Sequence, residues 1–285
     1  MQIADWEERF HALVERRTRT ASAAALSPFA TERDDAAETL AAIGNAWSRK
    51  MFGGLFYVSQ PLNAELPAAN LVFVQSREGN TATSDPSTLG GGEADTHLIY
   101  EGLSRVAADA VMGGAHTIGA GNMVLSIWRP ELVALRNAMA LPRHPTQIVA
   151  TLGGLALDRG VMFNVPELPV IVLTVRRGAE AMRSALEERP WISLVVMDGP
   201  EDLAGAFRQL RELGIERISC IGGRTLAAHL LDANLVQDVY LTTGTKSGGE
   251  PNTPVSGKPL NGREMVRKRG TGPDEGVLFQ HVVLT

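Results

Sequence analysis

The sequence predicts an α/β fold, in which a mostly parallel sheet is flanked by helices, with an antiparallel pair of strands at the C-terminus and a helical N-terminal extension. Two observations support this prediction. From residue 70 onward, short β-branched apolar runs alternate with stretches of helical periodicity, which is typical of a parallel sheet covered on both faces. The first 60 residues instead space their apolar side chains as helices do.

The N-terminal extension is expected to hold two helices. Apolar residues at spacings of three and four define one face of the first helix, and they are Ile3, Trp6, Phe10 and Leu13. A second helix is predicted over residues 31–47, because its acidic first turn suits the positive end of a helix dipole. Residues 53–67 are rich in glycine and proline and are expected to link the extension (1–60) to the main domain (61–285).

Strand-like runs follow the extension. They are 71–74, 110–112, 147–150, 170–174, 192–197, 217–221, 236–242 and 277–284. The clearest helix between them covers residues 201–213 and ends at Gly214. The last two strands have no helix between them. We therefore expect them to pair antiparallel through a long mobile loop that includes residues 244–257 and a charged segment after it.

The composition of the 285 residues is that of a globular chain. Hydrophobic residues make up 44% and charged residues 21%, which excludes a disordered, collagen-like or coiled-coil protein. The net charge of −5 argues against a nucleic-acid partner. No apolar run approaches the roughly 20 residues that span a bilayer, and the N-terminus lacks the order of a signal peptide. We therefore expect a cytoplasmic protein that binds a small molecule, with no membrane and no nucleic acid as partner.

A metal site is not expected. Cys220 is the lone cysteine, so a zinc site built from several cysteines is excluded. The six histidines show neither His-x-x-x-His nor His-Glu spacing.

Glycine-rich junctions between strand and helix are the candidate ligand sites. The sharpest is Gly222-Gly223, where glycines let a ligand approach the backbone and the free amide groups of the next helix favour an anion. A tight turn without a ligand explains this pair equally well. Residues 113–117 form a second such junction, with a simple strand-end turn as the alternative. Ser76 and Glu78 follow a strand at the sheet's carboxyl edge, where ligands of open α/β sheets bind, although Glu78 also fits a solvated loop.

Five segments of the chain match known motifs in sequence and in order. They are Ser76–Gly79, Gly91–Asp95, Leu103–Thr117, Cys220–Leu226 and Leu230–Asp238. Together they resemble the riboflavin-biosynthesis pyrimidine reductases, a dihydrofolate-reductase-like family that reduces a ribosylamino-pyrimidine phosphate with NADPH. The resemblance implies a dihydrofolate-reductase-like fold for residues 61–285 and NADPH as the cofactor.

The resemblance also implies roles for individual residues. Those placed at the cofactor are Val74, Thr117, Gly153, Gly222, Gly223, Arg224, Thr225 and Leu226. Those placed at the substrate are Ser76, Arg105 and Leu125. Glu78 is the candidate catalytic residue for protonation or orientation, with a structural role as the alternative, and it is expected to converge with Ser76 and Arg105 on the nicotinamide. Arg224 stands where the family commonly has a small residue or proline, and we expect its guanidinium to contact a phosphate such as the 2′-phosphate.

Departures from the family pattern lie mostly on the substrate side. Ile221 replaces a glutamate, Glu78 an aspartate, Asn80 a lysine or arginine, and Gly121-Asn122 an acidic pair. Isoleucine cannot pair with a pyrimidine edge, and an unpaired buried donor costs about 1–3 kcal/mol. We therefore expect an NADPH-dependent reductase of a small heterocyclic or imine-bearing substrate. The alternatives are the riboflavin-pathway reductase itself and a catalytically silent nucleotide-binding protein.

A homodimer is expected on two grounds. The resemblance implies pairing along sheet edges. The apolar face formed by Trp6, Phe10 and Leu13 also needs a surface to cover it, because an exposed apolar stripe promotes association.

Overall fold

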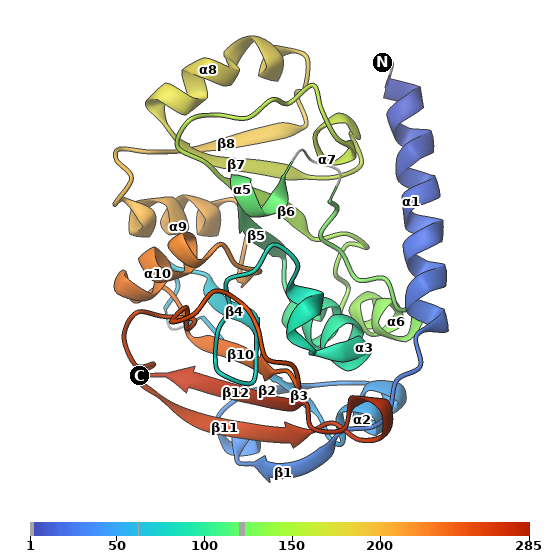
Figure 1. Cartoon of the computed structure of the whole chain (residues 1–285). Coiled ribbons are helices and arrows are strands. Elements are labelled where there is room, and N and C mark those ends of the chain that lie inside the picture. Colours follow the sequence, from blue (N-terminus) through green and yellow to red (C-terminus); the bar gives the residue numbers. More distant parts are fainter. Residues whose placement is uncertain (1–2, 62, 120–122) are drawn as a thin grey trace.

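One large sheet dominates the computed structural model, which describes residues 3–61, 63–119 and 123–285. Its parallel strands are β4 (Ala68–Gln75), β5 (Ala110–Gly114), β6 (Thr146–Ala150), β7 (Val170–Val175), β8 (Ile192–Met197), β9 (Arg217–Cys220) and β10 (Asp238–Thr243). Its antiparallel strands are β1 (Ala30–Asp34), β11 (Gly262–Arg269) and β12 (Leu278–Leu284). The strand order is β1-β11-β12-β10-β4-β9-β5-β6-β7-β8 (Figure 1). The mostly parallel sheet and the antiparallel pairing of β10 with β12 are confirmed.

A helix precedes the first strand of this sheet, and others lie between many of the later ones. They are α1 (Ile3–Ala23), α2 (Ala46–Phe52), α3 (Gly92–Ala94), the π-helix η3 (Asp95–Leu103), α4 (Ser104–Val106), α5 (Ala115–Ile118), α6 (Pro130–Ala138), α7 (Val161–Asn164), α8 (Arg176–Glu187), α9 (Leu203–Glu212) and α10 (Arg224–Asp232). Alternate residues of the central strands join two apolar clusters, Val72 and Val111 in one and Leu71 and Met112 in the other. Both faces are therefore buried, as expected for parallel strands. The helix predicted at 201–213 is confirmed as α9.

The prediction of a second N-terminal helix over residues 31–47 is wrong. That segment holds β1, the 3₁₀ turn η1 (Ala36–Glu38), the short strand β2 (Ala41–Ile43) and the start of α2. β1 pairs with β11 at the edge of the main sheet, and all of its residues are exposed. Backbone hydrogen bonds to a distant strand hold β1 in the sheet, and its side chains are exposed. Its sequence therefore lacks the apolar alternation that indicates a strand.

The segment expected to be a linker is also structured. Residues 53–67 contain β3 (Phe56–Val58), which is buried and pairs with β2 in a separate two-stranded sheet. The division of the chain into an extension (1–60) and a reductase domain (61–285) stays a prediction, and β1 reaches across that division to β11.

Strand β11 was not predicted, because it lies within the charged segment before the last strand. Its Lys268 is fully buried, and the ammonium group donates to Thr31 Oγ1 (2.9 Å) and to the Gly53 carbonyl (3.2 Å). Burial lowers the pKa of Lys268, while Asp34 at 3.4 Å opposes that shift. A lysine inside the fold thus joins β11 to the N-terminal segment, and nothing in the sequence distinguishes it from a surface lysine.

The apolar face of α1 is covered by the chain itself. Phe10 is fully buried and Trp6 is 8% exposed, and both pack in a cluster with Val124, Trp128 and Val165. The expectation that this face needs a second subunit is therefore wrong. Among the helices of the described residues, none is long and apolar enough to cross a bilayer.

The long segment after β10 does not stand free as the predicted mobile loop. Backbone amides join it to the turn after β4: Thr81 donates to the Thr253 carbonyl (2.7 Å), and Glu250 donates to the Ala82 carbonyl (2.8 Å). These bonds dock residues 244–257 against the carboxyl end of β4, where they border the candidate site.

Candidate functional site

The carboxyl ends of four neighbouring parallel strands form the edge at which the predicted cofactor residues meet. β4, β9, β5 and β6 are adjacent in the sheet. Val74 lies at the end of β4, Gly222 follows β9, Thr117 lies on α5 after β5, and Gly153 follows β6. In open α/β sheets this edge is where ligands bind, so the topology brings one predicted residue from each strand to one side of the molecule.

The Gly222-Gly223 turn has the geometry of an anion cradle. Both glycines have left-handed backbones, with φ of +112° and +81°, which other residues rarely adopt. A Cβ on Gly223 would lie 3.1 Å from Thr117 Oγ1, so the loops after β9 and β5 touch here. Helix α10 begins directly afterwards, without a side-chain cap. Its first amide groups are therefore free to donate to an anion, and the turn fits a phosphate group of a dinucleotide.

The remaining predicted cofactor residues surround this turn. Arg224 and Thr225 are exposed on the first turn of α10, and Leu226 is half-buried behind them. Arg224 Nε donates to the Pro254 carbonyl at 3.4 Å, a long bond that leaves the guanidinium available for a ligand. Gly153 is exposed, and a Cβ built on it would meet no atom within 4 Å, so the loop after β6 is open to solvent.

Hydrogen bonds between Ser76 and Glu78 close the turn after β4. The Ser76 hydroxyl donates to Glu78 Oε2 (3.0 Å) and accepts from the Glu78 amide (3.3 Å). Ser247 donates to Glu78 Oε1 at 2.6 Å, and this bond is the main reason why the pKa of Glu78 is lowered. Glu78 is therefore a carboxylate near neutral pH, an acceptor that fastens the loop after β10. Its catalytic role stays a prediction, and these contacts favour the structural alternative.

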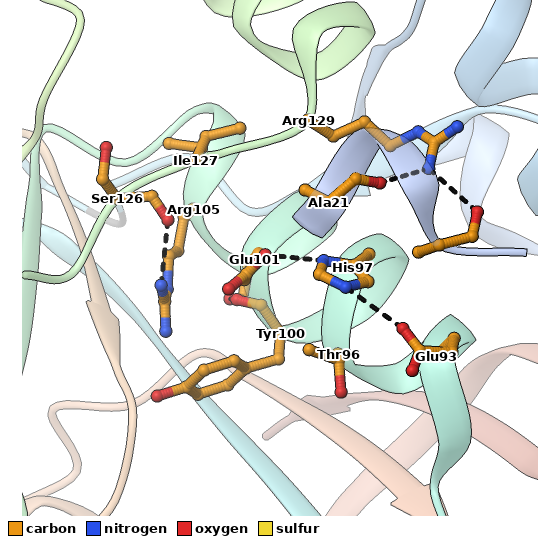
Figure 2. A network of polar contacts seen from close by, with 12 residues as sticks. Ala21, Glu93, Thr96, His97, Tyr100, Glu101, Arg105, Ser126, Ile127 and Arg129 are labelled. Atoms are coloured by element: carbon orange, nitrogen blue, oxygen red, sulfur yellow. Dashed lines mark hydrogen bonds and ion pairs between the residues drawn. The ribbon is translucent and has the colours of Figure 1, made fainter. Parts of the chain in front are cut away.

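Arg105 lies next to the other predicted substrate residue, Leu125. It is 2% exposed, its Nη1 donates to the Ser126 carbonyl (3.0 Å), and its guanidinium stacks on Tyr100 at 4.0 Å (Figure 2). Leu125, the residue before Ser126, is buried. The side chain of Gln147 accepts a hydrogen bond from the Leu125 amide and donates one to the Leu125 carbonyl. The structure thus brings Arg105 and Leu125 together. Among the described residues, no hydrogen bond joins Arg105 to Ser76 or Glu78, and their convergence stays a prediction.

Two nitrogens of Arg105, Nε and Nη2, are buried and have no hydrogen-bond partner among the described residues. A buried guanidinium with unused donors is costly unless an anion or a carbonyl completes it. This state fits a residue that binds an anionic group of a substrate.

A network of two carboxylates and one histidine spans the consecutive helices α3 and η3. His97 is 5% exposed, with Nδ1 at 2.8 Å from Glu101 and Nε2 at 3.2 Å from Glu93 (Figure 2). No group of three or more acidic, histidine or cysteine side chains within the part of the chain that is described is arranged to hold a metal ion. Pairs one turn apart on a helix stabilise it, and this network holds η3.

Sequence reasoning missed Asp95, the first residue of η3. Burial raises its pKa to about 6, the Thr242 hydroxyl opposes that rise, and Asp274 adds to it. Asp95 stands in the segment Gly91–Asp95, which matched a family motif, but an acidic residue at a helix start is so common that it gave no separate signal. Only the approach of distant Thr242 and Asp274 distinguishes it.

The replaced positions of the family pattern have ordinary surroundings. Ile221 is 8% exposed and packs in the main apolar cluster. Asn80 donates to the Gly248 carbonyl at 3.2 Å. Burial raises the pKa of the Cys220 thiol to about 11, so this cysteine is not a nucleophile near neutral pH. Gly121-Asn122 lies outside the described residues.

Solved structures of low sequence identity share this fold. A pyrimidine reductase-like protein from Corynebacterium diphtheriae matches with a TM-score of 0.61 and 19% identity, over 84% of this chain and 98% of that one. RibD of Acinetobacter baumannii matches with a TM-score of 0.59 and 16% identity, over 78% of this chain and 58% of its own. The riboflavin biosynthesis reductase Rib7 of Saccharomyces cerevisiae gives a TM-score of 0.52 and 17% identity, over 79% and 93%. At these identities the likeness shows the fold alone.

The sequence itself also matches a family. None of the curated proteins matches the chain. The RibD C-terminal domain, in contrast, matches over residues 70–273, from β4 to the 3₁₀ turn η4 (Gly272–Asp274) before β12. This range includes every residue of the candidate site, from Val74 to Leu226, and more than half of the chain. The protein therefore belongs to the RibD C-terminal domain family.

Proposed function

We propose that this protein is an NADPH-dependent reductase of a small heterocyclic or imine-bearing substrate. The Gly222-Gly223 turn carries this proposal, because it combines two left-handed glycines with an uncapped helix start at the carboxyl edge of the sheet. Membership in the RibD C-terminal domain family supports it, as does the fold shared with Rib7, a riboflavin biosynthesis reductase of Saccharomyces cerevisiae.

The chain's own residues would divide the work between cofactor and substrate. The amide groups at the start of α10 and the Arg224 guanidinium would hold phosphate oxygens, while Thr117 would border the same turn. NADPH, when bound, supplies a hydride to an electrophilic carbon of the substrate. Arg105, with two unused donors, would hold an anionic group of the substrate and so fix its orientation.

Two alternatives remain distinct from this proposal. The riboflavin-pathway reductase itself would need a partner for the pyrimidine edge, and the buried Ile221 offers none. A catalytically silent nucleotide-binding protein would bind NADPH without oxidising it. Turnover of NADPH with the riboflavin intermediate and with cyclic imines separates the three.

NADPH is expected to bind more tightly than NADH, because Arg224 adds a positive charge at the phosphate turn. A charge-assisted hydrogen bond is worth about 1.5–3 kcal/mol, or roughly ten- to a hundredfold in affinity. Arg224→Gln should reduce the preference by that factor, whereas Arg16→Gln, at an exposed position of α1, should leave it unchanged. Isothermal calorimetry measures both. Equal affinities in the native protein would contradict the role of Arg224, and no binding of either nucleotide would contradict the reductase proposal.

We also propose a homodimer on the basis of the resemblance, because other parts of the same chain already cover the apolar face of α1. The edge strand β8 has no second neighbour in the described sheet and exposes Val196. Light scattering at micromolar concentration is expected to give twice the 30.5 kDa of one chain. A particle of the single-chain mass would contradict the proposal.

A further inference from the structure

Residues 124–128 form a buried segment without regular secondary structure in front of α6. Its backbone groups need partners, because buried amides and carbonyls without hydrogen bonds are costly. Side chains supply these partners. Gln147 bonds both backbone groups of Leu125, at 2.8 Å and 3.0 Å, and Arg143 Nη1 donates to the Ile127 carbonyl at 2.6 Å. The position of this segment therefore depends on side chains that other parts of the chain bring to it.

Ser126, in the middle of this segment, joins it to Arg105. The Ser126 carbonyl accepts from Arg105 Nη1 at 3.0 Å, while the Arg105 guanidinium stacks on Tyr100 at 4.0 Å (Figure 2). Because a guanidinium is planar, a bond at one nitrogen and a stack on one face together fix where the other nitrogens point. Those nitrogens are Nε and Nη2, which are buried without a partner among the described residues. The Ser126 backbone thus sets the direction of the unused donors of Arg105.

His144 and Arg143 hold the Ser126 side chain. Arg143 Nη1 donates to Ser126 Oγ at 3.2 Å, and His144 Nδ1 lies 2.8 Å from the same atom. An arginine can only donate, so the hydroxyl proton of Ser126 is free to bond His144 Nδ1. Burial lowers the pKa of His144 to about 4, and the charges of Arg143 and Arg136 add to the shift. The imidazole is therefore uncharged near neutral pH, and its Nδ1 accepts from Ser126.

Helix α1 packs against His144 and against both ends of the segment. The ring of Phe10 meets the imidazole in an edge-to-face arrangement, with 5.3 Å between the ring centroids, a spacing that aromatic pairs favour. Phe10 is fully buried, and it shares an apolar cluster with Val124 and Trp128. α1 therefore covers residues 124–128 together with one of the side chains that hold them.

The N-terminal part of the chain also holds the residue that follows this segment. Arg129 donates from Nη1 to the Ala21 carbonyl of α1 at 2.7 Å (Figure 2), and its guanidinium stacks on Trp47 of α2 at 4.7 Å. The match to the RibD C-terminal domain begins at residue 70. Helices outside the matched range thus hold the segment that orients Arg105.

We propose that His144 is a positioning residue for Arg105, and that Phe10 on α1 holds His144 in place. This inference rests on the proposed reductase function, in which Arg105 binds an anionic group of the substrate. It gives residues 1–60 a task in that function: through Phe10, His144 and Ser126 they keep the unused donors of Arg105 in the orientation that the anionic group requires.

Two substrates that differ by one charged group test the proposal. They are 1-pyrroline and 1-pyrroline-2-carboxylate, which share a C=N bond and differ by a carboxylate. The assay follows NADPH oxidation and gives the ratio of kcat/KM for the carboxylate to kcat/KM for 1-pyrroline. A variant that only destabilises the fold lowers the amount of active enzyme for both substrates and leaves the ratio unchanged. A variant that misdirects Arg105 lowers the ratio, because only the carboxylate uses the guanidinium.

Two variants and a matched control separate these effects. Phe10→Leu removes the ring that contacts His144, and His144→Phe keeps a ring but removes the acceptor for Ser126. Each should lower the ratio about tenfold, a part of the roughly ten- to a hundredfold expected for loss of Arg105 itself. Phe207→Leu is the control, because Phe207 is also fully buried but packs on α9 in a different apolar cluster. It should lower stability and leave the ratio unchanged.

Combination with Arg105→Met tests whether the effect is exerted through Arg105. In the Arg105→Met background, Phe10→Leu and His144→Phe should not lower the ratio further, because the effects of residues that act through one group do not add. A further fall of the same size in the double variants would overturn the positioning role.

A second readout needs neither cofactor nor turnover. The bond to Ser126 and the stack on Tyr100 should slow rotation about the Nε–Cζ bond of Arg105. Its two Nη groups should therefore give separate nitrogen NMR signals in the free protein, and Arg105→Met assigns these signals by removing them. They should merge in Phe10→Leu and in His144→Phe and stay separate in Phe207→Leu.

Each outcome decides a separate statement. An unchanged ratio in His144→Phe would overturn the positioning role, and so would an equal fall of the ratio in Phe207→Leu. Separate Nη signals in Phe10→Leu would overturn the hold of α1 on Arg105. Absence of NADPH turnover in the native protein would refute the reductase function, and equal kcat/KM for the two substrates would refute the anion-binding role of Arg105. In both cases the NMR spectra would still decide whether α1 and His144 hold its guanidinium.

Discussion

Gly223→Val is expected to weaken NADPH binding at least about a hundredfold. The substitution places a branched side chain where a Cβ alone would already lie 3.1 Å from Thr117 Oγ1, so it fills the space beside the α10 amide groups. Loss of two hydrogen bonds to a phosphate, each worth about 1.5–3 kcal/mol, accounts for this factor. Calorimetric titration with NADPH measures it.

Gly214→Val is the matched control for this variant. Gly214 has a φ of +85°, close to the +81° of Gly223, and a Cβ built on it would meet no atom within 4 Å. Both variants force an L-residue into a backbone with positive φ, which residues with a side chain disfavour, so both should lower thermal stability. Only Gly223→Val should lose the nucleotide. Equal NADPH affinities in the two variants would show that the Gly222-Gly223 turn does not bind the nucleotide.

Arg136→Met is expected to lower the free energy of unfolding by about 3–5 kcal/mol, because several buried carbonyls would lose their donor. Arg136 is fully buried, its Nη1 donates to the carbonyls of Val106 (3.2 Å) and Ala108 (2.7 Å), and its Nε donates to Pro142 (2.6 Å). Burial lowers the pKa of Arg136 to about 10, so it stays charged near neutral pH. Urea denaturation measures the loss.

Arg105→Met, in contrast, should leave the free energy of unfolding nearly unchanged and lower kcat/KM. Arg105 makes one hydrogen bond, to Ser126, and stacks on Tyr100, while two of its nitrogens have no partner. Methionine keeps the apolar volume and removes an incompletely paired buried charge, so stability should change by about 1 kcal/mol or less. If Arg105 binds an anionic group of the substrate, kcat/KM should fall about ten- to a hundredfold, with NADPH affinity unchanged. A large loss of stability with unchanged kcat/KM would leave Arg105 a purely structural role.

Strands that bury one or both of their faces could be predicted from the sequence. Every predicted run overlaps a strand of the sheet, and the helices predicted at residues 3–13 and 201–213 overlap α1 and α9. The spacing of apolar residues reflects burial against neighbouring layers. It can therefore be recognised in the sequence without knowledge of which element packs there. The turn at Gly222-Gly223 could also be predicted from the sequence, because a backbone with positive φ favours glycine.

Elements held by backbone pairing or by buried charge could not be predicted. β1 is exposed along its whole length, and β11 carries the buried Lys268 among surface charges. β1 pairs with β11, more than 200 residues away along the chain, and no local pattern encodes such a distance. β11 also pairs with the neighbouring strand β12, but its charged residues hide the apolar pattern of a strand.

The sequence by itself determined the α/β architecture, the family and the glycine turn at the cofactor edge. Only the tertiary structure distinguished residues of one type from each other: Arg136, whose donors are largely used, from Arg105, whose donors are not, and Asp95 from the other acidic residues at helix starts. The physical reason is that residue type fixes which groups are present, whereas their charge state and free donors depend on burial and on partners that the chain brings in from elsewhere.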